Sequence, residues 1–152
     1  MSDKRTRAWL RAGALCALVI VLDQVAKALV EEKIVLGEQV GLLGPLQLTL
    51  SHNNGVAFGL AGGGGAVLIV VTVAALALVA ALFARNPARP GMWVAFGLIA
   101  GGAIGNLADR VRLGAVTDFI DLPHWPNFNL ADMAITAGVL VLAFIYLRDA
   151  EE

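Results

Sequence analysis

The feature that most restricts the fold of this chain is a long stretch without charge. From Gln39 to Ala84, 46 consecutive residues include no Asp, Glu, Lys or Arg. Charged residues make up only 15% of the 152-residue sequence and apolar residues 59%, whereas an ordinary soluble domain is about 25% charged. Because a soluble domain of this length could not cover its surface with so little charge, the sequence predicts a membrane protein.

Four segments are long and apolar enough to cross a bilayer, whose hydrocarbon core needs roughly 20 mostly apolar residues per helix. We expect helices near residues 8–30, 66–83, 92–108 and 130–147, with outer loops at about 31–65 and 109–129. The predicted fold class is an all-α integral membrane protein, in which residues 1–152 form a single membrane-embedded domain.

Basic residues gather on one side of these predicted spans. Seven of the eleven Lys and Arg residues lie there, namely Lys4, Arg5, Arg7, Arg11, Arg85, Arg89 and Arg148. The positive-inside rule assigns this side to the cytoplasm. We therefore expect both termini to be cytoplasmic and both longer loops to lie on the outer face of the membrane.

Composition also disfavours several functional classes. The net charge of −1 and the lack of a basic stripe argue against nucleic acid as a partner. Cys16 is the only cysteine, and His52 and His124 lack the spacing of metal ligands. The sequence therefore predicts neither a metal site nor a cofactor.

The first outer loop contains a predicted strand. Leu46, Leu48 and Leu50 alternate with polar residues, a period of two that is typical of a half-buried strand. Turn-forming residues flank this segment on both sides. We expect a short sheet at the outer membrane surface, with Phe58 and Trp125 near the interface, where they could hold a bound molecule from above.

Charged residues within a span need a partner or a task, because one at the bilayer centre costs roughly 2.5–3.5 kcal/mol. Asp23 and Lys27 are four residues apart on one face of the first helix. They form either a local ion pair or part of a substrate site. Asn106, Asp109 and Arg110 share a face at the end of the third helix, which suits helix packing, donation to a peptide backbone, or both.

Asp118 and Asp132 are candidates for a catalytic pair. Asp118 lies in an apolar run and Asp132 opens the fourth helix, while Pro123 and Pro126 between them prevent a continuous helix and let the chain fold back. Two adjacent carboxylates share a proton and can hydrolyse a peptide bond as general acid and base. Alternatively, Asp132 stabilises the helix dipole, and Asp121 is a solvated loop residue.

A small ion-coupled transporter is the alternative from another class, with Asp23, Lys27 and Asp132 as a proton relay. It predicts polar residues near the middle of several spans and an inverted repeat. The sequence contains neither pattern.

Five blocks of residues occur in order from the first predicted helix to the fourth. They are Asp23-Gln24-x-x-Lys27, Asn53-x-Gly55-x-Ala57-Phe58, Gly101-Gly102-Ala103-x-Gly105-Asn106-x-x-Asp109-Arg110, Val116-x-Asp118-Phe119-x-Asp121 and Phe128-Asn129-x-Ala131-Asp132. Together these blocks resemble the lipoprotein signal peptidases, also called signal peptidase II, of bacterial cytoplasmic membranes. The segment between the two candidate acids, which are 14 positions apart, is short for that family.

The resemblance implies four transmembrane helices, a small extracytoplasmic β-sheet and an outer loop or helix between the third and fourth spans. It implies an aspartic endopeptidase that needs no cofactor and cuts prolipoproteins before a Cys carrying diacylglycerol. Expected partners are these substrates, membrane lipid and cyclic peptide inhibitors of the globomycin type, and we expect a monomer. By motif position, Asp118 and Asp132 would be catalytic. Residues that bind substrate or support the pair would be Asp23, Lys27, Asn53, Gly102, Asn106, Arg110 and Asn129.

Overall fold

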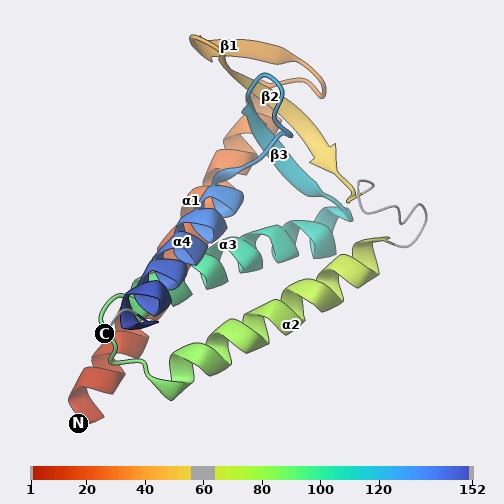
Figure 1. The fold of residues 1–152 in the computed structure, drawn as a ribbon. Coiled ribbons are helices and arrows are strands. Elements are labelled where there is room, and N and C mark those ends of the chain that lie inside the picture. The colour runs from red at the N-terminus through yellow and green to blue at the C-terminus, as the bar shows by residue number, and fades with distance from the viewer. Residues whose placement is uncertain (1, 56–63, 151–152) are drawn as a thin grey trace.

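The computed structural model describes residues 2–55 and 64–150 and consists of four long helices and one small sheet. The helices are α1 (Ser2–Lys33), α2 (Gly64–Arg85), α3 (Met92–Leu113) and α4 (Leu130–Ala150), and the strands are β1 (Gln39–Leu43), β2 (Leu46–Asn53) and β3 (Val116–Asp121). The sheet lies at one end of the helix bundle, and the start of α1 and the end of α4 lie at the other (Figure 1).

All four helices are long and apolar enough to cross a membrane, which confirms the predicted fold class. The predicted spans fall within the observed helices. The third helix extends furthest beyond its predicted end, because it continues through Asp109 and Arg110 to Leu113. It stops at Gly114, whose φ of 75° is left-handed and whose N–H donates to the Arg110 carbonyl at 3.0 Å.

The sheet has the strand order β1-β2-β3, with both pairs antiparallel. The predicted strand at Leu46, Leu48 and Leu50 is confirmed as part of β2, and Gly44 supplies the turn before it with a positive φ of 56°. Strand β3 was not predicted. Its first four residues are all buried, so the sequence shows no alternation that would distinguish a strand from a buried loop.

Two apolar clusters hold the sheet and the helices together. Next to the sheet, Leu50 of β2 and Phe119 of β3 pack against Val30 and Ile34 at the end of α1. At the far end of the bundle, the rings of Phe83 and Phe96 stack between α2 and α3 and the Trp9 ring of α1 packs edge-to-face against both, with centroids 4.6–5.7 Å apart. The sheet is therefore held against the end of α1. Because Asp118 precedes Phe119 on β3, this packing also fixes the position of Asp118.

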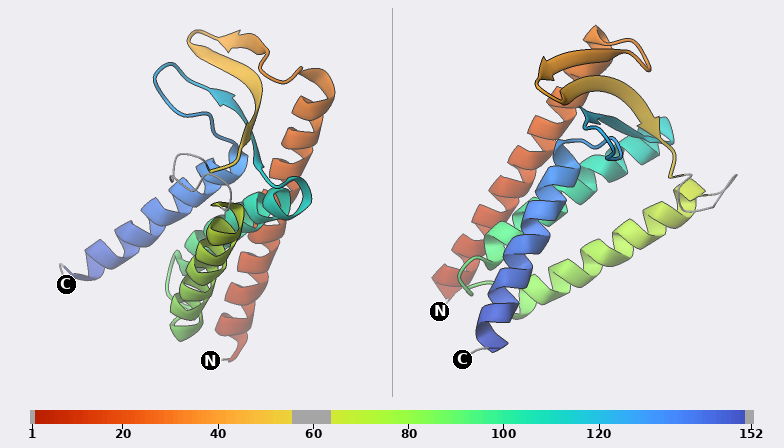
Figure 2. Two further views of the ribbon diagram at one scale, coloured as in Figure 1. Left: turned by 90° about the vertical axis from the view of Figure 1, so that its right-hand side faces the viewer. Right: turned by 45° about the horizontal axis from the view of Figure 1, so that its top comes forward.

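Helix α3 lies at the centre of the bundle and is largely buried, whereas α2 is largely exposed. Both views in Figure 2 show the sheet over one end of the helices, with the start of α1 and the end of α4 at the opposite end. Close packing of α3 depends on residues without side chains. A methyl group at Gly101 would come within 2.9 Å of the Cys16 carbonyl oxygen, and one at Gly102 would overlap the Ala131 carbonyl oxygen.

Candidate active site

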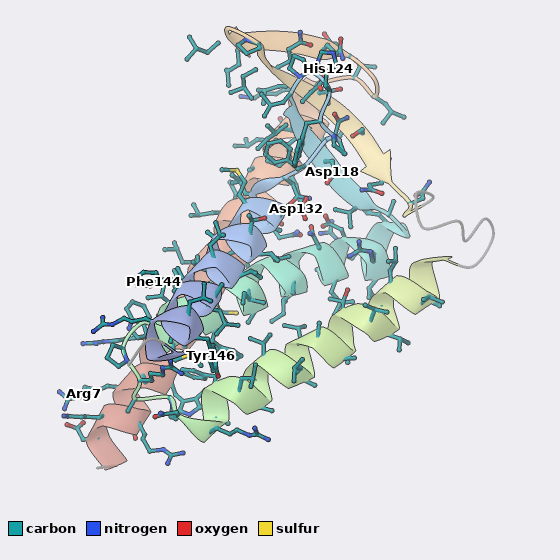
Figure 3. The ribbon with its side chains drawn as sticks, in the orientation of Figure 1. Arg7, Asp118, His124, Asp132, Phe144 and Tyr146 are labelled. Atoms are coloured by element: carbon teal, nitrogen blue, oxygen red, sulfur yellow. The ribbon has the colours of Figure 1, made fainter. Side chains whose placement is uncertain are left out.

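Asp118 and Asp132 come together where the sheet meets α4. Asp118 projects from β3, and Asp132 lies in the first turn of α4 (Figure 3). Asn129 links them, because its side-chain amide donates to Asp118 Oδ1 at 2.7 Å and its backbone N–H donates to Asp132 Oδ2 at 3.3 Å. The segment between the two acids, which contains Pro123 and Pro126, folds back as predicted.

Asn129 also precedes helix α4 directly and caps it. Its side-chain oxygen accepts the backbone N–H of Asp132 at 2.9 Å, while Asp132 accepts the backbone N–H of Asn129 in return. This reciprocal pattern is a capping box, which satisfies N–H groups that have no partner within the helix. The interpretation of Asp132 as a first-turn acid and its membership of the pair are therefore compatible.

Burial sets the acidity of Asp118, which is only 2% exposed. Removal from water raises the pKa of its carboxyl group from the ordinary 3.8 to about 6. The negative charge of Asp132 also raises this pKa, whereas hydrogen bonds from Asn53 and Asn129 lower it. The Asn53 side-chain amide donates to Asp118 Oδ2 at 3.1 Å. A pKa near 6 lets this group hold and release a proton near neutral pH.

A buried charge network supports the pair from below. The Lys27 ammonium lies 2.8 Å from Asp23 Oδ2, which confirms that these two residues form an ion pair, and 2.6 Å from Asp109 Oδ2. Lys27 also donates to Asn106 Oδ1 at 3.0 Å, and Asn106 donates through its amide to Asp132 Oδ1 at 2.8 Å. The side-chain amide of Asn106 thus connects the ion pair of the first helix to Asp132.

Asp23 reaches the fourth helix as well. Its Oδ1 accepts the backbone N–H of Ala131 at 2.9 Å. Gly105 of α3 leaves room for the Asp23 carboxylate, because a methyl group there would come within 2.8 Å of Asp23 Oδ2, and Gly102 lets α3 contact α4 directly at Ala131. Gln24 completes the network by donating to Asp109 Oδ1 at 2.9 Å. The sequence predicts Asp109 on a face that suits helix packing or donation to a peptide backbone, not as a partner of Lys27, and gives Gln24 no role, although both stand in the matched blocks.

Arg110 and Asp121 do not join this network. The predicted shared face of Asn106, Asp109 and Arg110 is divided: the first two side chains are buried against Lys27, whereas Arg110 is half-buried and its guanidinium makes no hydrogen bond to any residue of the described ranges. Asp121 accepts a hydrogen bond from Gln39 at 2.8 Å at the sheet. The predicted interfacial Phe58 lies outside the described residues.

A cavity of about 400 Å³ opens beside Asp132. Apart from Asp132 and Thr136, its lining is apolar and comes from Trp125, Phe128, Met133, Ala137 and Leu140. Trp125 is 67% exposed and borders this cavity. In residues 2–55 and 64–150 we find no group of three or more His, Cys, Asp or Glu side chains arranged to hold a metal ion.

Comparison with known proteins identifies the family of this chain. Residues 15–148 match the family model described as signal peptidase (SPase) II. The lipoprotein signal peptidase of Pelotomaculum thermopropionicum is 41% identical over 91% of this chain and 92% of its own length, and that of Moorella thermoacetica is 42% identical over 91% and 93%. A solved bacterial membrane enzyme superposes with a TM-score of 0.85 at 30% identity, covering 91% of this chain and 93% of that one. The chain therefore belongs to the signal peptidase II family.

Proposed function

We propose that Asp118 and Asp132 are the catalytic pair with which this peptidase removes signal peptides from prolipoproteins. The observation that carries the proposal is that two carboxyl groups from separate elements meet at one residue beside an apolar cavity: the side-chain amide of Asn129 donates to Asp118, and its backbone N–H donates to Asp132. Two carboxyl groups in this arrangement can share one proton, which is the chemistry of aspartic peptidases.

The proposed reaction needs only water and the two acids. The ionised carboxylate takes a proton from water as the water oxygen attacks the scissile carbonyl carbon, while the protonated carboxyl group gives its proton to the carbonyl oxygen. Collapse of the tetrahedral intermediate breaks the C–N bond, and the leaving nitrogen takes up a proton from the pair. The raised pKa of Asp118, about 6, supports this exchange.

The remaining predicted residues take positioning and binding roles in this proposal. Asn53, Asn106 and Asn129 hold the acids by hydrogen bonds, and Asp23 with Lys27 holds Asn106 and the start of α4. Gly102 lets α4 approach α3. The half-buried Arg110 would donate to carbonyl oxygens of the substrate through its planar guanidinium.

We further propose that the substrate enters sideways from the lipid and is cut before a Cys carrying diacylglycerol. The cavity beside Asp132 borders Met133 and Leu140, which are 49% and 65% exposed on α4 and suited to acyl chains. Cyclic peptides of the globomycin type would compete for the same site. The protein would act as a monomer, with the whole chain as one peptidase unit.

The distribution of charge supports an orientation with both termini in the cytoplasm. The basic side chains of α1 and of the α2–α3 loop lie at the end opposite the sheet, so the catalytic pair would face outward. A transporter gains no support, because the buried charges of the described helices lie together beside β3, where the Thr117 backbone N–H donates to Asp109.

Replacing either acid by Asn tests the proposal. Each replacement keeps the shape of the side chain but removes proton exchange, so Asp118→Asn and Asp132→Asn should each lower turnover by at least a few orders of magnitude. The double variant should be little worse, because residues that act as a unit are non-additive. The measurement is cleavage of a diacylglyceryl-modified precursor, with an unmodified precursor in parallel.

Asp121→Asn is the matched control and should retain most activity. Thermal unfolding in detergent establishes that each variant is folded. If either catalytic variant kept more than about a tenth of the turnover, the loss would correspond to less than about 1.4 kcal/mol of barrier. That is too small for a group that carries the proton, and the assignment of the pair would be wrong.

A further inference from the structure

A cavity at the end of the bundle opposite the sheet is lined by cations from two separate segments. Its volume is about 360 Å³. The start of α1 contributes Lys4, Arg7 and Arg11, and the α2–α3 loop contributes Arg89. Figure 3 places Arg7 far from Asp118 and Asp132. This basic cavity therefore lies outside the proposed peptidase site and has no role in its chemistry.

The spacing of the cations along α1 explains why they meet. Residues 4, 7 and 11 recur at the three- and four-residue intervals that place side chains on one helix face. The other described residues that line the cavity are Ala8, Pro87, Ala88, Pro90 and Trp93, so no acid is among them. Asp3 pairs with Arg7, and both side chains remain exposed. The cavity thus keeps an excess of positive charge.

Contacts with neighbouring groups hold two of these cations in place. Arg89 donates to the Ile145 carbonyl oxygen at 2.7 Å, and its guanidinium carbon lies 4.6 Å from the centre of the Tyr146 ring. The guanidinium carbon of Arg11 lies 6.0 Å from the centre of the Trp93 ring. Cations held in this way lose less conformational entropy when they bind an anion than mobile side chains would.

We infer that the basic cavity binds the phosphate group of an anionic phospholipid. Guanidinium groups match phosphate oxygens in pairs, and basic pockets between transmembrane helices bind lipid headgroups. Trp93 supplies an aromatic side chain of the kind that favours the membrane interface. Leu10, three residues after Arg7 and so on a neighbouring part of the same helix face, is 68% exposed, which provides an apolar surface for acyl chains.

The test uses the full-length protein in phosphatidylcholine nanodiscs, with and without phosphatidylglycerol. Phosphatidylglycerol should raise the unfolding temperature and should be retained preferentially when the lipids that stay bound are measured by native mass spectrometry. The double variant Lys4→Gln/Arg11→Gln should weaken this retention, by about fivefold for each cation removed. Lys33→Gln is the matched control, because Lys33 is an exposed cation at the opposite end of α1 and does not line this cavity.

Three outcomes would overturn the inference: no preference for phosphatidylglycerol in the parent protein, equal weakening by Lys33→Gln, or equal stabilisation by inorganic phosphate in phosphatidylcholine discs. The last outcome would assign the cavity to free phosphate. Unchanged precursor cleavage in phosphatidylcholine discs shows that the double variant is folded. Should it not fold, Lys4→Gln alone, at an exposed position, answers the same question.

Discussion

The two ends of the helix bundle accommodate charge in opposite ways. At the sheet end, the side chains of Asp23, Lys27 and Asp109 are at most 3% exposed, and Lys27 lies within 2.8 Å of both acids. At the basic end, Lys4, Arg7 and Arg11 of α1 remain exposed. Buried charges must be neutralised within the chain, and this requirement fixes their geometry. Exposed charges leave neutralisation to solvent or a bound anion.

The largest effect should come from Lys27→Met. The substitution leaves Asp23 and Asp109 buried without their cation, and breaking a buried pair in this way costs about 3–5 kcal/mol of unfolding free energy. The measurement is reversible unfolding in mixed micelles. Adding Asp23→Asn and Asp109→Asn to Lys27→Met should recover part of the loss. If the single variant were as stable as the parent, the contrast between the two ends would not hold.

A smaller loss should follow from Gly102→Ala. The new methyl group would come within 2.8 Å of Ile135 Cγ1 and would overlap the Ala131 carbonyl oxygen, and overpacking of this kind costs about 1–3 kcal/mol. Gly13→Ala is the control, since a methyl group there meets nothing within 4 Å. Equal stability of the two variants would show that α3 and α4 can separate without cost.

Asn53→Ala should change the pKa of Asp118. The Asn53 amide stabilises the ionised form of Asp118, so its loss should raise the Asp118 pKa further above its value of about 6. The pH at which the cleavage rate changes through this group should therefore move upward. The measurement is a pH profile of kcat/KM, with Asn54→Ala as the control. A downward shift would contradict the assigned hydrogen bond.

The free energy of unfolding should also depend on pH through Asp118. Because the folded pKa of Asp118, about 6, lies above the ordinary 3.8, its stabilising contribution is complete below pH 3.8 and is lost as the pH rises through about 6. Asp118→Asn should remove this part of the pH dependence of unfolding.

The smallest effect should come from Arg7→Ala at the basic end. The Asp3–Arg7 pair has side chains 75% and 57% exposed, and exposed pairs four residues apart contribute only about 0.3–0.5 kcal/mol. The free energy of unfolding, measured in a neutral detergent without anionic lipid, should therefore fall by no more than about 0.5 kcal/mol. A loss comparable with that of Lys27→Met would show that the exposed charges are structural too.

The helices were predictable because lipid requires long apolar runs, and β2 because its leucines alternate. Strand β3 was not predictable, because burial removes the polar alternation from Val116 to Phe119. The resemblance pointed to Asp118 and Asp132, and their meeting depends on the fold. The positions of Asn106 and Asp109 around Lys27 follow from how α1 packs against α3, which no local sequence pattern encodes.

In the short segment between Asp118 and Asp132, backbone hydrogen bonds join the residues just after Asp118 to Phe128, which precedes Asp132. Phe119 and Ile120 donate to the Phe128 carbonyl at 3.1 and 2.8 Å, and Phe128 donates back to Ile120 at 3.1 Å. Residues 122–127 therefore form a loop whose two ends are held together by these hydrogen bonds. Since loop closure depends only weakly on loop length, insertions within 122–127 should leave both acids where they are. An insertion between Asn129 and Asp132 would instead shift the helix start and separate the acids.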